Sequence, residues 1–177
     1  MFDLDEPKKN GVPFVDEVEL FNATFGKPNF YEPTIPNKKI SDFVVNFIKE
    51  ETEELAEAIE ENDIVEVLDA ICDLLYVAVG NATMAFGLKD KLLPAYAEVQ
   101  ASNMSKSCAT EEEARQTKIV REAEQGEPCY YKEVNGRFVV YRASDDKVMK
   151  SIKYFAPDLV QFFTPEELDN IENGKRD

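Results

Sequence analysis

The sequence contains no histidine, and its three cysteines, Cys72, Cys108 and Cys129, form no CxxC pair. These absences exclude the usual zinc sites, which need Cys and His ligands. They also exclude every catalytic triad or general base that depends on imidazole. A metal in this protein must therefore be bound by oxygen ligands, and proton transfer must use other side chains.

Basic residues are also scarce, because 20 Lys and Arg face 36 Asp and Glu and leave a formal net charge of −16. Such a surface repels phosphate backbones, so we expect no nucleic-acid partner. A phosphate-bearing ligand would meet the same repulsion. A bound divalent cation would offset this repulsion between the acidic protein and the phosphate.

Long apolar runs are missing too. No run is long enough to span a membrane, and no N-terminal stretch resembles a signal peptide. We therefore expect no membrane partner and a cytoplasmic location. Hydrophobic residues make up 44% of the chain, which is enough to build a core.

Helical periodicity and capping residues predict a mostly helical chain. Residues 1–12 are a polar lead-in, and Phe14, Val18, Phe21 and Phe25 lie on one face of a predicted first helix. A proline-rich loop follows at 27–39. Two long helices are predicted next, over 41–61 with Ser41 as N-cap and over 64–86 after a break at Asn62-Asp63. Three more helices are predicted over 91–103, over 110–125 with a Thr110/Glu113 capping box, and after Thr164-Pro165.

A β-hairpin interrupts this pattern. The dipeptide Asn135-Gly136 separates two strand-like segments, 129–134 and 137–141, and is the strongest short signal for a tight hairpin turn. The predicted fold is therefore an all-α helical bundle that carries one small β-hairpin.

Acidic residues interrupt the apolar faces of both long helices. On a helical wheel Glu51 falls inside the apolar arc of the first, and Glu50 and Glu54 lie at its edge. The second helix is apolar around nearly its whole circumference, which predicts burial on all sides. Glu66 and Asp69 interrupt it, together with Asp73, within about 60° of one another.

Three carboxylates on one buried stripe would repel one another and lose solvation, and a divalent cation among them removes both costs. The acids could also be present without a metal. The glutamate-rich run at 50–61 could be a solvated face, and the stripe could pair with bases from elsewhere, although 41–81 holds only one base, Lys49. All-oxygen ligation favours Mg²⁺, with Mn²⁺ as the alternative.

These residues resemble a known superfamily. Glu50-Glu51-Thr52-Glu53-Glu54 followed by Glu66-Val67-Leu68-Asp69 matches the EExxE…ExxD pattern of the all-α NTP pyrophosphohydrolases, which include MazG, phosphoribosyl-ATP pyrophosphohydrolase and dimeric dUTPases. Ser102-Asn103-Met104-Ser105-Lys106 and Asp146-Lys147-Val148-Met149-Lys150 resemble further segments of a phosphoribosyl-ATP-pyrophosphohydrolase-like subgroup found in phages and bacteria. This likeness runs from about Phe14 to Asp158.

The resemblance implies a MazG-like bundle that hydrolyses a nucleoside triphosphate to the monophosphate and pyrophosphate. It implies a metal bound by carboxylates, with Asn103, Lys106, Lys147 and Lys150 as phosphate contacts; apart from the motif, these four would be ordinary surface residues. Because the chain has no histidine, we expect a carboxylate such as Glu51 or Glu54 to be the base, and the apolar setting of Glu51 favours it. Alignment on Leu74-Leu75-Tyr76 favours Asp73 as the second-helix ligand, whereas literal ExxD spacing favours Glu66 and Asp69. The metal candidates are thus Glu50, Glu51, Glu54, Glu66, Asp69 and Asp73.

The chain departs from the subgroup in two places. Asp145-Asp146-Lys147 has Asp where the subgroup usually has Gly, and some forty residues separate Lys106 from Lys147 where the connection is usually short. The predicted domains are therefore a helical core at 1–106, an inserted helix and hairpin at 107–144, and a C-terminal segment at 145–177.

Several functions are compatible with these residues. The substrate could instead be dUTP or phosphoribosyl-ATP, and an acidic, non-catalytic binding protein or DNA mimic is the rival from another class. The resembled families also predict a homodimer or homotetramer, which would cover the apolar second helix. Phe21, Phe25 and Tyr76 could stack a nucleotide base, but their spacing is more typical of core packing.

Overall fold

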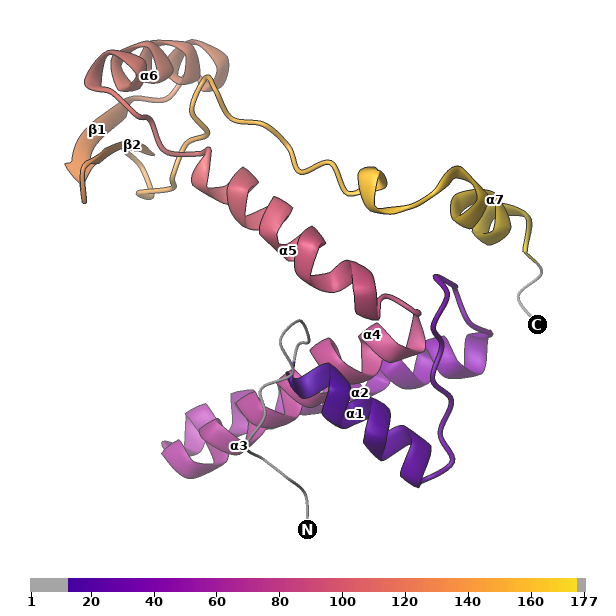
Figure 1. The fold of residues 1–177 in the computed structure, drawn as a ribbon. Helices are drawn as coiled ribbons and strands as arrows, with labels where there is room; N and C mark the ends of the chain where they lie inside the picture. The colour runs from indigo at the N-terminus through magenta and orange to yellow at the C-terminus, as the bar shows by residue number, and fades with distance from the viewer. Residues whose placement is uncertain (1–12, 175–177) are drawn as a thin grey trace. The chain divides into compact units, whose positions relative to one another are not determined.

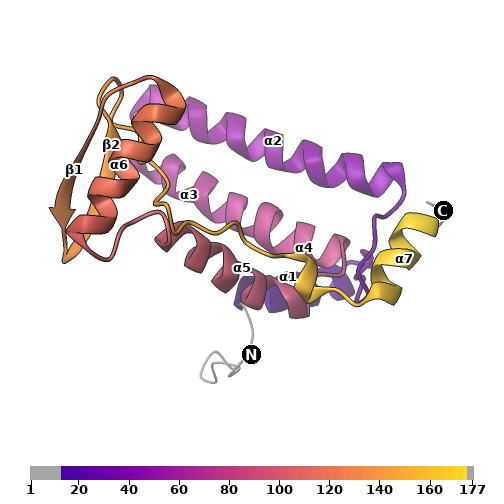
Figure 2. The same cartoon turned by 90° about the horizontal axis from the view of Figure 1, so that it is seen from above.

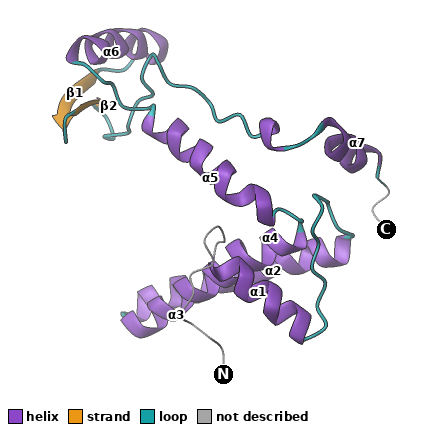
Figure 3. Ribbon diagram, viewed as in Figure 1, coloured by secondary structure: helices purple, strands orange, loops and turns teal. Residues whose placement is uncertain are grey.

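A computed structural model describes residues 13–174, so the predicted lead-in at 1–12 lies outside the described part. The described residues are mostly helical, with one two-stranded antiparallel sheet (Figures 1 and 3). They form two compact units. We call the residues up to Leu93 and from Phe163 onward the helical unit, and Pro94–Phe162 the mixed unit.

Helix α1 (Pro13–Thr24) begins the helical unit. Its buried residues are Val15, Val18 and Asn22. The core packing predicted for Phe21 and Phe25 was therefore wrong, because these side chains are 41% and 63% exposed. Phe14 is 39% exposed as well. The two neighbouring aromatics still contact each other, with ring centroids of Phe21 and Phe25 4.4 Å apart.

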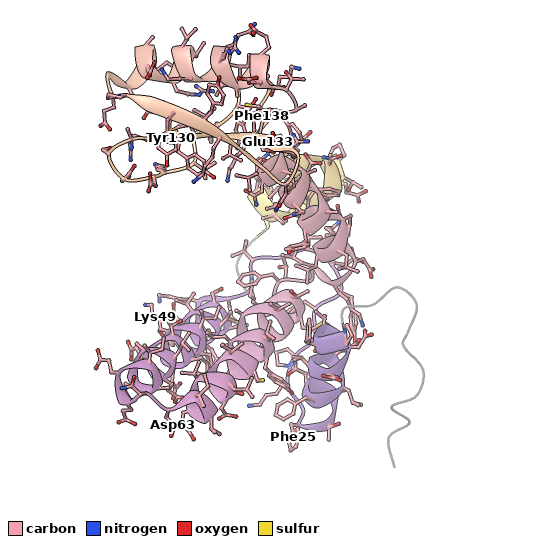
Figure 4. All side chains as sticks on the ribbon, turned by 90° about the vertical axis from the view of Figure 1, so that its left-hand side faces the viewer. Phe25, Lys49, Asp63, Tyr130, Glu133 and Phe138 are labelled. Atoms are coloured by element: carbon pink, nitrogen blue, oxygen red, sulfur yellow. The ribbon has the colours of Figure 1, made fainter. Side chains whose placement is uncertain are left out.

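Helix α2 (Lys38–Glu61) begins earlier than predicted. The side chain of Asn37 accepts a hydrogen bond from the backbone N–H of Ile40 and is the N-cap, whereas the hydroxyl of Ser41 donates to the carbonyl of Pro36. The predicted break is confirmed, since Asn62 has a φ of 55°. Lys49 near the middle of α2 and Asp63 just beyond its end are marked in Figure 4.

The predicted helix over 64–86 is helical throughout but not uniform. It consists of α3 (Ile64–Leu74), a π-helix η1 (Leu75–Asn81) and α4 (Ala82–Ala85). The N–H of Ala82 bonds to the carbonyl of Val77, five residues back rather than four. Helices α2 and α3 lie side by side, and α1 packs against η1 (Figure 2).

The close approach of α1 to η1 depends on Gly80. A Cβ at this position would lie 2.3 Å from Cγ2 of Val18 and 3.2 Å from the carbonyl oxygen of Phe14. Such contacts are too short for any larger residue, so glycine lets the two backbones meet.

The prediction that the second long helix is buried on all sides was wrong for the single chain. Among the residues of α3 only Ala70 is buried, while Ile64, Val65 and Leu68 are 76%, 69% and 62% exposed. The reason is that α3 has α2 on one side, and no described element of the same unit covers its opposite face.

The mixed unit joins the end of α5 (Lys89–Met104) to α6 (Glu111–Gln125) and to strands β1 (Cys129–Val134) and β2 (Arg137–Arg142). The predicted hairpin is confirmed: Val134 pairs with Arg137, and Asn135 and Gly136 both have positive φ. The core of this unit lies between α6, the hairpin and the following segment, and consists of Cys108, Ala114, Cys129, Val140 and Met149.

The compact units do not coincide with the segments predicted at 1–106, 107–144 and 145–177. Met149 lies in the same core as Cys108 and Val140, and its N–H donates to the carbonyl of Val140 at 2.8 Å. The stretch that was predicted to be an insertion therefore folds together with the residues that follow it.

Threonine residues cap two further helices. The side chain of Thr110 caps α6 as predicted, but the carboxylate of Glu113 accepts from the N–H of Ala109 rather than closing a full capping box. A complete capping box between Thr164 and Glu167 opens α7 (Pro165–Asn173), after a short 3₁₀ turn η2 (Val160–Phe162).

No described helix combines the length and apolar character needed to cross a membrane.

Candidate metal and phosphate-binding residues

Glu51 lies on the most buried stripe of α2. The three buried residues of this helix, Val44, Glu51 and Ala58, are seven residues apart, which places them on one face. Glu51 is 8% exposed, and within the described residues its Oε2 atom has no hydrogen-bond partner. A buried carboxylate oxygen without a partner is costly, and binding to a hard cation would offset that cost.

The acids of α3 differ in burial. Asp73 is half-buried and follows Ala70 by one helical turn, so it lies on the side of α3 that faces the core. Asp69 and Glu66 are exposed. The carboxylate of Asp63 has a structural role, because it accepts hydrogen bonds from the backbone N–H groups of Val65 and Glu66 at the start of α3.

The pKa of Glu51 is raised above its ordinary value. Burial is the largest cause, and the negative charges of Asp73, Glu54, Glu50 and Asp69 add to it in that order. The structure therefore places four of the other five predicted carboxylates close enough to Glu51 to raise its pKa. Glu66 is not among the groups that shift Glu51 most.

The carboxylates of the second helix do not lie on the fully buried stripe that the sequence predicted. Glu50, Glu54 and Asp69 are exposed, because α3 is open on its outer side. Within residues 13–174, no three acidic or thiol side chains already converge at the spacing of a metal site. What fits a hard cation is the donor set itself, which is all oxygen, and the unpartnered oxygen of Glu51.

The predicted phosphate contacts belong to the mixed unit. Lys106, Lys147 and Lys150 line one cavity of about 430 Å³. The Nζ atom of Lys106 also donates to Oδ1 of Asn103 at 2.8 Å. Lys106 therefore meets Lys147 and Lys150, which lie some forty residues further along the chain. Asn103 contacts this group through Lys106.

Arg121 also lines this cavity and was missed by the sequence analysis. It belongs to no recognised motif and lies in the segment predicted to be an insertion. One weak signal was available: Lys118, Arg121 and Gln125 recur at helical spacing along α6, which predicts a common face.

Asp146 explains one departure of the sequence from the resembled subgroup. Its φ is 56°, a left-handed conformation that glycine adopts freely and that Asp tolerates better than most residues. Its carboxylate also accepts a hydrogen bond from the hydroxyl of Tyr130 at 2.7 Å. The substitution therefore keeps the turn that orients Lys147.

Comparison with known proteins identifies a family and a viral relative. A family model described as phosphoribosyl-ATP pyrophosphohydrolase matches residues 18–103. An uncharacterized protein of Acanthamoeba polyphaga mimivirus is 40% identical over 75 residues, which is 38% of this chain and 28% of the viral protein. The chain thus spans little more than a quarter of that relative. The family match includes every predicted carboxylate and Asn103, and it ends before Lys106, Lys147 and Lys150.

Proposed function

Because residues 18–103 belong to the phosphoribosyl-ATP pyrophosphohydrolase family, within the MazG-like NTP pyrophosphohydrolase superfamily, we propose that the chain is a Mg²⁺-dependent nucleoside-triphosphate pyrophosphohydrolase. It cleaves an NTP or dNTP to the monophosphate and pyrophosphate. The observation that carries the proposal is the buried Glu51, with an unpartnered oxygen, among acids of two adjacent helices.

The metal is proposed to bind at α2 and α3. Glu50, Glu51 and Glu54 would supply ligands from α2, and Asp69 and Asp73 from α3, with Glu66 as the outermost candidate. Bound Mg²⁺, or Mn²⁺ in its place, would neutralise phosphate charge and lower the pKa of water. Glutamates at 50 and 54 are exposed and can reorient readily, since exposed side chains change rotamer quickly.

Glu51 is the preferred general base, and Glu54 is the second choice. A base works best when its pKa lies near the working pH, and burial moves the pKa of Glu51 in that direction. In the reaction, the oxygen of water forms a bond to the α-phosphorus while the bond from this phosphorus to the bridging oxygen breaks. The carboxylate takes the proton of the attacking water, and pyrophosphate leaves.

The substrate contacts are proposed to come from the mixed unit. Lys106, Lys147 and Lys150 would contact phosphate oxygens as point charges, and Asn103 would orient Lys106 through the hydrogen bond described above. Nucleotide phosphates carry several negative charges, so a protein with a net charge of −16 needs such a group of bases.

Self-association is proposed for the open face of α3. Ile64, Val65 and Leu68 form an exposed apolar surface that a second copy could cover in a homodimer or homotetramer. Covering this face would also exclude water from the neighbouring acids and bring α3 closer to the burial on all sides that the sequence predicted.

Phosphoribosyl-ATP itself is the second candidate substrate, because the matching family carries its name. A dUTPase activity would use the same carboxylates. The acidic mimic is less well supported, since a mimic has no use for a buried carboxylate such as Glu51.

The test is a panel of canonical and modified NTPs and dNTPs, with dUTP and phosphoribosyl-ATP, assayed for pyrophosphate with and without Mg²⁺. We expect metal-dependent release from at least one nucleotide. Glu54→Ala and Asp73→Ala should abolish it while the fold is retained, and Glu60→Ala, on the exposed side of α2, should leave it unchanged. If no nucleotide yields pyrophosphate, or if Glu54→Ala and Asp73→Ala remain fully active, the proposal is wrong.

A further inference from the structure

The charge of the protein is unevenly distributed between its units. The mixed unit, Pro94–Phe162, has 11 acids and 10 bases, whereas the rest of the chain has 25 acids and 10 bases. Nearly all of the net charge of −16 therefore lies outside the mixed unit. An anion approaching the mixed unit meets far less repulsion than the overall composition suggests.

The cavity of the mixed unit is basic. Its lining comprises four cationic residues, one amide and two apolar residues, and none of them is acidic: Lys106, Arg121, Gln125, Lys147, Val148, Met149 and Lys150. Its volume of about 430 Å³ is within the range of small-molecule sites. Concave surfaces with charges of one sign concentrate ions of the opposite sign.

Arg121 ties helix α6 to the backbone that carries Lys150. Its Nε atom donates to the carbonyl of Lys150 at 2.8 Å, and its Nη2 atom donates to the carbonyl of Ser151 at 3.3 Å. Its Nη1 atom pairs with Glu124. All three nitrogen atoms of the guanidinium therefore contact protein groups, and two of them hold the backbone at Lys150 and Ser151.

The same backbone is held from its other side. The N–H of Ser151 donates to the carbonyl of Lys106 at 3.1 Å, and the Ser151 hydroxyl donates to Oε1 of Glu113 at 2.5 Å. Helix α6 thus contributes Arg121 and Glu113 to the placement of one short segment. The lysines before and after the 107–144 stretch are brought together by that stretch.

The ammonium groups keep donors for a ligand. Lys106 gives one hydrogen bond to Asn103, and Lys150 lies 4.2 Å from the ring centroid of Tyr154, while an ammonium carries three donors. The pKa of Tyr154 is lowered first by a hydrogen bond with Ser102, and then by the charge of Lys150, a hydrogen bond with Lys150 and the charge of Lys106. Both lysine charges therefore act at the hydroxyl of Tyr154, and the ammonium group of Lys150 still has donors beyond this one bond.

We propose that this cavity binds a phosphoanion without any divalent cation, and that Arg121 is a positioning residue that acts through Lys150. The inserted helix is then part of the binding site rather than an accessory. That the anion is the phosphate chain of a nucleotide rests on the proposed function, whereas binding of a phosphoanion as such does not.

The experiment is calorimetric titration of the full chain with pyrophosphate in excess EDTA. We expect saturable binding, weakened about tenfold or more by Lys150→Gln. Lys132→Gln is the matched control, because it removes a charge from the same unit but outside the cavity, and it should leave the affinity unchanged. Circular dichroism checks that each variant is folded.

Two further variants test the role of Arg121. Arg121→Lys keeps the charge but loses the planar fork that reaches two carbonyls, so we expect it to weaken binding as much as Arg121→Gln does. When Arg121→Lys is combined with Lys150→Gln, the affinity for pyrophosphate should fall no further than in Lys150→Gln alone, since both changes remove the same contact.

The outcomes separate the two proposals. Absence of pyrophosphate binding in EDTA, or equal losses in Lys132→Gln and Lys150→Gln, overturns the phosphoanion site even if Mg²⁺-dependent catalysis is found. Full retention of affinity in Arg121→Lys, or an additive loss in the double variant, overturns the positioning role. Binding in EDTA without catalysis on any nucleotide would uphold the cavity and overturn the proposed function.

Discussion

After burial itself, the charge of Asp73 on α3 does most to raise the pKa of Glu51 on α2. The two residues come from different helices, so the shift records how closely α2 and α3 bring their acids together. It also has a consequence for stability, because a carboxyl group that holds its proton more tightly when folded favours the folded state at low pH.

We therefore expect the metal-free protein to lose stability as pH rises from the ordinary pKa of a glutamate, about 4.3, through the raised pKa of Glu51. Glu51→Gln should remove this part of the pH dependence. It should raise Tm at pH 7 by about 2–4 °C if relief of the buried charge is worth about 1 kcal/mol. Thermal unfolding at pH 5 and pH 7 in EDTA measures both effects.

Glu53→Gln is the control, since Glu53 lies on the exposed side of the same helix. Added Mg²⁺ should raise the Tm of the wild type and not that of Glu51→Gln, because a ligand that binds only the folded state stabilises it. A Tm for Glu51→Gln that is below wild type at pH 7 in EDTA would contradict the prediction.

Glu113 should show the opposite pH dependence. Burial acts to raise its pKa, but hydrogen bonds from Ser151 and the N–H of Ala109, with the ion pair to Lys153, outweigh burial and leave it lowered. Its contribution to stability is thus present above the unfolded pKa and is lost as pH falls through the folded pKa. Glu113→Gln should destabilise the protein by about 1–3 kcal/mol at pH 7 and by less at pH 3.

Urea unfolding at the two pH values measures this change. The neighbouring Glu112 is exposed and shares the first turn of α6, so Glu112→Gln is a close control and should change stability little. If the two substitutions change the free energy of unfolding equally, the buried contacts of Glu113 do not stabilise the protein.

Gly80→Ala should destabilise the helical unit. The new Cβ would overlap Val18, which is fully buried, and overpacking of this kind costs about 1–3 kcal/mol. The double variant with Val18→Ala should lose less than the sum of the two single changes, because the smaller side chain makes room. The same Val18→Ala change should be additive with Gly126→Ala, since nothing lies within 4 Å of a Cβ at Gly126.

Leu68→Gln should disrupt self-association. Leu68 is 62% exposed on α3, so a polar residue costs the single chain little but interrupts an apolar contact between copies. Light scattering after size exclusion should show the mass falling toward 20.1 kDa, that of one chain. Ile119→Gln on α6, where Ile119 is 65% exposed, is the control and should leave the assembly intact. A wild type that already has the mass of one chain would refute the assembly.

The features that could be predicted from sequence are those with a local cause. The turn at Asn135-Gly136 and the capping box at Thr164 depend on a few adjacent residues, and both are present. The burial of Glu51 followed from its place on one helical wheel. In each case the residues that determine the structure lie within a turn or two of one another.

Other features depend on contacts that a single sequence does not reveal. An apolar helix can be covered by its own chain or by a second copy, so the exposure of Leu68 could not be foreseen. Asn37 and Ser41 are both suitable N-cap residues, so the sequence did not determine which of them begins α2. Arg121 reaches Lys150 across 29 positions through its side chain, and no local pattern predicts such a contact.

The π-helix at Leu75–Asn81 takes up one surplus residue, because its backbone bonds run five residues back rather than four. Deletion of one residue within it would let the stretch close as an ordinary α-helix. Asp73 and the buried Thr83, Met84 and Ala85 would then keep their places about the common axis. The same deletion within α3 would instead rotate every later side chain by about 100°, so this long helical stretch tolerates a shorter chain at the π-helix and not before it.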